Sequence, residues 1–131
     1  MNLKSKNLKT MNLKSLILAS LIAVAVPAAA HDVEKGPHGG RIVDAGTYHV
    51  ELVAKDNTVD VFLTSGGDKP VSAAGFKGTA ILVVDGKAQR IALEATGSAK
   101  LTGKAGVALP AQPKGAVQLT APDGKTASAK F

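Results

Sequence analysis

The sequence contains no cysteine, no tryptophan and only two methionines, and both methionines, Met1 and Met11, lie near its start. Disulfide bonds therefore cannot stabilise the fold, so the core has to come from aliphatic packing. Beyond Met11 no sulfur ligand remains, which excludes cuprous, thiolate-bound and iron–sulfur sites there. A metal site in the body of this protein is restricted to nitrogen and oxygen ligands.

Aromatic residues and clustered charge are also scarce. The chain has one tyrosine and three phenylalanines in 131 residues. Its formal charge is +6, but four of the sixteen basic residues precede residue 31, and the remaining twelve against ten acids give +2. Those twelve are scattered singly along the chain, whereas nucleic-acid binding needs a clustered basic face, usually with aromatic rings that stack on bases. We therefore expect no binding to nucleic acid.

Only one long apolar run is present, from Leu16 to Val26. Four lysines precede it, and Pro27 and the small residues Ala28–Ala30 follow it, as in a secretory signal peptide. The run is too short to span a bilayer, which takes about 20 apolar residues. We therefore predict that residues 1–30 are a cleaved signal peptide, that the protein is periplasmic without a membrane anchor, and that His31 is the first mature residue.

After residue 30 no segment shows a helical stripe, whereas the alternation typical of strands recurs. The polar, turn-rich residues 31–40 predict a flexible N-terminal arm, and residues 41–131 predict one domain. Three pairs of turn residues lie between strand-like runs and predict three hairpins, namely Asp56-Asn57, Asp85-Gly86 and Asp123-Gly124. With short strands at 41–44 and 100–103, about seven or eight strands result. We expect a small immunoglobulin-like antiparallel β-sandwich.

The first predicted hairpin has a register that agrees with burial. A two-residue turn at Asp56-Asn57 pairs three sets of apolar residues on one face, which are Val50 with Leu63, Leu52 with Val61, and Ala54 with Val59. On the opposite face the alternation places His49, Glu51 and Asp60. We expect this polar face to be solvated, with Glu51 and Asp60 at the surface.

All three histidines, His31, His38 and His49, lie within the first nineteen residues of the predicted mature chain. Imidazole is the commonest protein ligand for borderline metals, and a terminal amine beside its own imidazole can chelate Cu(II). We therefore predict a Cu(II) or Zn(II) site from these three residues. The alternative is that each acts alone: His31 in solvent, His38 in a turn that Gly39 and Gly40 permit, and His49 on a solvated strand face.

Catalytic motifs are missing. The chain has no Gly-x-Ser-x-Gly elbow, no glycine-rich phosphate loop before a helix and no paired carboxylates in a recognisable setting. A copper oxidase built on a terminal histidine is disfavoured, because so small a domain offers little surface for a substrate. We expect that the protein is not an enzyme.

The runs Gly36–Val43, Tyr48–Val53 and Val61–Leu63 carry a resemblance to a known family. They resemble a small secreted domain of stand-alone periplasmic proteins, and a similar His-Gly-Gly opening occurs in the periplasmic adaptor subunits of heavy-metal efflux pumps. The likeness covers residues 36–95 and implies a β-sandwich domain in bacterial metal homeostasis. It carries over only His38, Gly39 and Gly40 as candidate functional positions. The coiled-coil hairpin and lipoyl-like segment of the adaptors are missing from this chain.

Two functions follow as hypotheses. The first is a soluble periplasmic protein that holds or passes Cu(II) or Zn(II) and takes part in metal homeostasis, with a heavy-metal efflux system as its partner. The second is a structural or interaction module that binds no metal and contacts an envelope partner through its sheet edges. The oligomeric state is left open by the sequence.

Overall fold

The structure is a computed structural model that describes residues 34–131. The predicted signal peptide and His31 lie outside this range. Within it, no helix is long and apolar enough to cross a membrane. The described residues form ten strands, with bounds β1 Glu34–Lys35, β2 Arg41–Ala45, β3 Tyr48–Lys55, β4 Thr58–Ser65, β5 Lys69–Pro70, β6 Lys77–Val84, β7 Lys87–Thr96, β8 Lys100–Lys104, β9 Lys114–Thr120 and β10 Thr126–Lys130.

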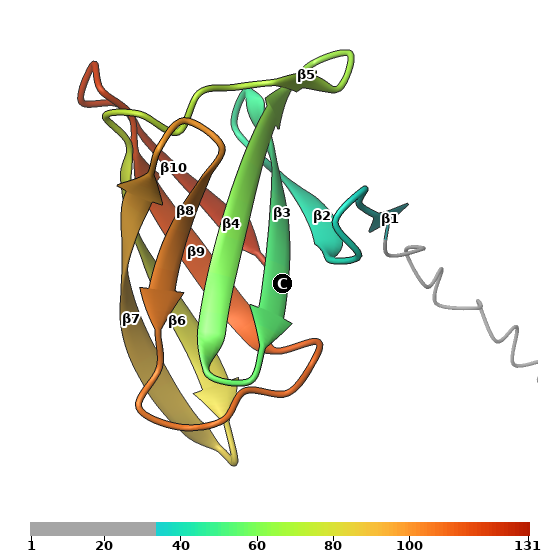
Figure 1. The fold of residues 1–131 in the computed structure, drawn as a ribbon, viewed down its shortest axis with the longest axis vertical. Coiled ribbons are helices and arrows are strands. Elements are labelled where there is room, and N and C mark those ends of the chain that lie inside the picture. The colour runs from blue at the N-terminus through green and yellow to red at the C-terminus, as the bar shows by residue number, and fades with distance from the viewer. Residues whose placement is uncertain (1–33) are drawn as a thin grey trace, which may run out of the picture. The chain divides into compact units, whose positions relative to one another are not determined.

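These strands form one antiparallel sheet in the order β1-β2-β3-β4-β8-β7-β6-β9-β10, with β5 paired to β4 (Figure 1). The all-β prediction is therefore confirmed. The finer prediction of an immunoglobulin-like sandwich is not confirmed, because β8 pairs with β4 on one side and with β7 on the other and so joins the two halves of the sheet. The sheet curls into a half-barrel around its core.

The hairpins predicted from turn residues are present. In the first, Val50 pairs with Leu63 and Leu52 with Val61, which confirms the predicted register. At the second, Asp85 and Gly86 have φ values of 52° and 76°. A type I′ turn requires positive φ at both central residues, which explains why Asp-Gly stands between β6 and β7.

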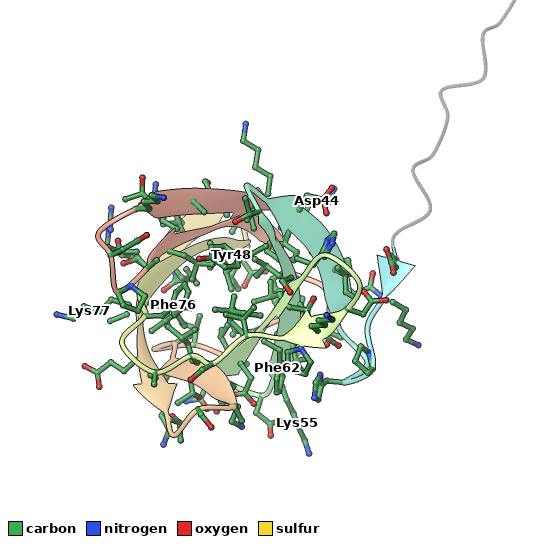
Figure 2. The ribbon with its side chains drawn as sticks, turned by 90° about the horizontal axis from the view of Figure 1, so that it is seen from above. Asp44, Tyr48, Lys55, Phe62, Phe76 and Lys77 are labelled. Atoms are coloured by element: carbon green, nitrogen blue, oxygen red, sulfur yellow. The ribbon has the colours of Figure 1, made fainter. Side chains whose placement is uncertain are left out.

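The core fills the inside of the curl. Alternate residues of the long strands point inward, and the largest fully buried side chains are Leu82, Ile91, Leu93, Leu101, Leu119, Val50, Val59, Val61 and Val117. Near one end of the core, the rings of Tyr48 and Phe76 meet edge to face with centroids 5.5 Å apart (Figure 2). In the same view Lys55 and Lys77 extend outward from the sheet. This aliphatic packing is the stabilisation that a chain without disulfides needs.

The last strand of the sheet, β10, lies against β2, the second strand from the other end, although no strand pairing joins these two strands in residues 34–131. The guanidinium carbon of Arg41 lies 5.6 Å from the centre of the Phe131 ring. Arg41 also donates a hydrogen bond to the carbonyl of Pro113. Side chains rather than a ladder therefore hold this seam together.

Candidate functional site

The loop from Gly36 to Gly40 joins β1 to β2 and folds back on itself. The Gly36 N–H donates to the Gly40 carbonyl at 2.9 Å, and the Gly39 N–H donates to the Gly36 carbonyl at 3.0 Å. Gly39 has a φ of 85°, a conformation that side-chain-bearing residues rarely adopt. Residues 34–40, which belong to the predicted arm, therefore form a short strand and a closed loop against the sheet.

The carboxyl group of Glu51 lies inside this loop. Its Oε1 accepts hydrogen bonds from the backbone N–H of His38 at 2.8 Å and of Gly40 at 3.0 Å. Its Oε2 lies 2.7 Å from Nδ1 of His38. Glu51 is only 4% exposed, so the expectation of a solvated surface residue is wrong. The alternation correctly places Glu51 on the face away from the core, but the loop covers that face.

Two glycines permit this close approach. A Cβ atom at Gly36 would overlap the carboxyl group of Glu51, and a Cβ atom at Gly40 would overlap the backbone carbonyl of Leu52. The loop can therefore close around the carboxylate only if both positions lack a side chain. The close packing around Glu51 therefore explains why glycine stands at both positions of the Gly-Pro-His-Gly-Gly segment, and this explanation does not depend on a ligand.

The imidazole of His38 is held in place from two directions. Its ring stacks on the ring of Phe62, with centroids 3.6 Å apart and planes 4° from parallel. Nδ1 faces Glu51, and the side chain as a whole is 47% exposed. Since Nδ1 is occupied, Nε2 is the ring nitrogen that can bind a ligand.

Two open grooves adjoin His38, with volumes of about 480 and 310 Å³. Both are lined by Pro37, His38, Phe62, Thr64 and Asp68. The smaller groove also includes Glu34 and Glu51. The imidazole of His38 is thus accessible from solvent through both grooves. At least one carboxylate side chain lines each of them.

His49 lies on the same outer face of the sheet, two residues before Glu51 along β3. Its Nδ1 is 2.7 Å from Oδ1 of Asp44, the residue opposite it on β2. This pair is far more open than the other, since the Asp44 side chain is 82% exposed and that of Glu51 is 5%. Both described histidines therefore have a carboxylate at Nδ1, but only His38 has a buried one.

The third predicted ligand, His31, falls outside the described residues. Within residues 34–131 no three histidine, aspartate or glutamate side chains lie close enough together to hold a metal ion. The structure therefore describes His38 and His49 as separate histidine–carboxylate pairs.

Asp60 also departs from the expectation of a solvated residue. Its Oδ1 accepts a hydrogen bond from the Thr102 hydroxyl at 2.8 Å, and its Oδ2 lies 3.1 Å from Nζ of Lys100. These partners are on β8, which pairs with β4. Asp60 therefore helps to join the two halves of the sheet. This role could not be predicted without knowing that β4 pairs with β8.

Comparisons of the chain with family models, with curated proteins and with solved structures find no match. The site is therefore interpreted from its own geometry. Sequence reasoning selected His38 but missed Glu51, whose carboxylate contacts both the backbone N–H and Nδ1 of His38. One signal was available, because a glycine-rich loop with several free N–H groups needs an acceptor, and Glu51 is a carboxylate on the outer strand face.

Proposed function

We propose that this protein is a periplasmic metal-binding protein that holds Cu(II) or Zn(II) through histidine nitrogens, with His38 as the central ligand. One observation carries the proposal: Nδ1 of His38 is hydrogen-bonded to the buried carboxylate of Glu51, while no group of residues 34–131 is hydrogen-bonded to Nε2. Histidines that bind metals in proteins almost always have their other ring nitrogen paired in this way, because the pairing fixes the ring and raises its basicity.

One ligand does not make a stable site, and His31 and His49 are proposed to complete it. In the sequence only two residues, Asp32 and Val33, lie between His31 and Glu34, which lines the groove beside His38. His49 contributes a second imidazole on the same face of the sheet, and Nδ1 is the nitrogen of that ring that pairs with Asp44.

The proposed setting is the periplasm, reached through the signal peptide of residues 1–30. A heavy-metal efflux system is the proposed partner, on the strength of the resemblance carried by the segment around His38. In this proposal the curled sheet is a variant of the immunoglobulin-like β-sandwich that the resemblance implies. The protein would hold the ion and would not transform it.

Titration calorimetry of Cu(II) and Zn(II) into the secreted protein tests the proposal. We expect tighter binding of Cu(II) than of Zn(II), as the usual divalent order requires. Binding should weaken as the pH falls, because protons compete for imidazole and amine nitrogens. Intact mass of the secreted form checks that it begins at His31.

Three variants identify the ligands: His38→Ala, His49→Ala and a chain extended by one residue before His31, which converts the terminal amine into an amide. We expect the largest loss of affinity from His38→Ala. Equal affinity in all three variants and the unaltered protein would refute the metal site. The interaction module without metal would then be the better description.

A further inference from the structure

The contacts of Glu51 determine where His38 carries its proton. Oε1 of Glu51 already accepts two backbone N–H groups, from His38 and Gly40. An ionised carboxylate can only accept hydrogen bonds. With Glu51 ionised, Oε2 at 2.7 Å from Nδ1 can only accept, so Nδ1 is the donor. In the neutral imidazole the proton is then on Nδ1, and Nε2 carries the free lone pair.

The direction of this lone pair is fixed as well. The parallel stack on Phe62 sets the plane of the imidazole, and the contact with Glu51 sets its rotation within that plane. Because the same carboxylate holds the backbone N–H groups on either side of Gly39, the loop and the ring are fixed together. His49 lacks this support, since its partner Asp44 is largely exposed.

We propose that Glu51 is a positioning residue, which keeps His38 in the tautomer protonated on Nδ1 and thereby makes Nε2 the nitrogen that binds the metal. The metal-binding part of this inference rests on the proposed function. The tautomer part does not, because it follows from the hydrogen bonds between Glu51, His38 and Gly40 alone.

Glu51→Gln is the variant that separates the charge from the shape of the side chain. The amide oxygen can still accept the two backbone N–H groups, but its NH₂ group then faces Nδ1 and donates to it. This reversal moves the imidazole proton to Nε2, so Nε2 no longer has a free lone pair with which to bind a metal. The loop keeps its backbone contacts, so a far-ultraviolet circular dichroism spectrum like that of the unaltered protein is expected.

Glu94→Gln is the matched control, because it makes the same chemical change at an exposed glutamate on β7, a strand that carries none of the three histidines. We therefore expect little change in the tautomer of His38 and less than a twofold change in zinc affinity.

The first measurement is long-range ¹H–¹⁵N correlation NMR of the ¹⁵N-labelled protein. The secreted form is purified, stripped of metal and measured at alkaline pH. We expect His38 protonated on Nδ1 in the unaltered protein and on Nε2 in Glu51→Gln. A proton on Nε2 in the unaltered protein would overturn the inference, and this result needs no variant to fold.

The second measurement is titration of the same proteins with zinc chloride. Loss of such a supporting hydrogen bond typically weakens metal affinity 10–100-fold, and we expect this loss in Glu51→Gln. If His38→Ala weakens zinc binding but Glu51→Gln does not, the inference is wrong and the proposed function stands. If the tautomer is as expected but His38→Ala leaves zinc binding unchanged, the positioning of His38 is supported and the proposed function fails.

Discussion

Replacement of Glu51 by alanine is the most informative single change in this protein. The alternation of β3 alone predicts a small effect, of less than about 0.5 kcal/mol, because surface substitutions rarely cost more. The structure predicts a much larger one. Glu51→Ala removes the acceptor of two backbone N–H groups and the partner of the His38 imidazole at once.

The magnitude follows from the groups left without partners. A buried donor that loses its acceptor costs about 1–3 kcal/mol, so two backbone N–H groups and one ring N–H set an upper range of about 3–9 kcal/mol. The loop lies at the surface and His38 is 47% exposed, so water can replace part of this loss. We therefore expect a decrease of about 2–4 kcal/mol in the free energy of unfolding.

Urea denaturation followed by circular dichroism measures this decrease. With an m-value of about 2 kcal/mol/M, the midpoint should fall by about 1–2 M while the slope is unchanged. Glu94→Ala is the control, because Glu94 is an exposed glutamate on β7, and its effect should be within about 0.5 kcal/mol. Equal midpoints for the two variants would show that the carboxylate does not hold the loop.

Other changes test the core, the loop and the seam. Leu52→Ala should cost about 2–5 kcal/mol in urea denaturation, since Leu52 is 3% exposed, and a cost below 1 kcal/mol would place it outside the core. Gly36→Ala should displace the buried carboxylate and lower the thermal midpoint by several degrees, whereas Gly66→Ala, which meets no atom within 4 Å, should change it little. Similar midpoints for these two would contradict the closed loop. Arg41→Ala should remove the contact with Phe131, worth about 0.5–1 kcal/mol, and speed hydrogen exchange along β2 and β10. Unchanged exchange there would mean that the arginine does not hold the seam.

The β3–β4 hairpin shows how much local sequence can determine. Its turn at Asp56-Asn57, its register and its buried face were all predictable, because the alternation and the turn length together leave one pairing that buries apolar residues. The Asp85-Gly86 hairpin follows for the same reason. The contacts of a hairpin join strands that are adjacent in the sequence, so a few consecutive residues determine their geometry.

The tertiary structure decided two other matters. The pairing of β8 with both β4 and β7 makes one curled sheet out of what could have been two, and strand periodicity contains no information about such distant partners. The loop around Glu51 turns a polar position on an outer strand face into a buried one. Alternation states which side of a sheet a residue faces, whereas burial depends on what the rest of the chain places over that side. The sequence by itself therefore determined the longer strands and the candidate His38, whereas the short strands β1 and β5 and the contact between Glu51 and His38 were decided only by the fold.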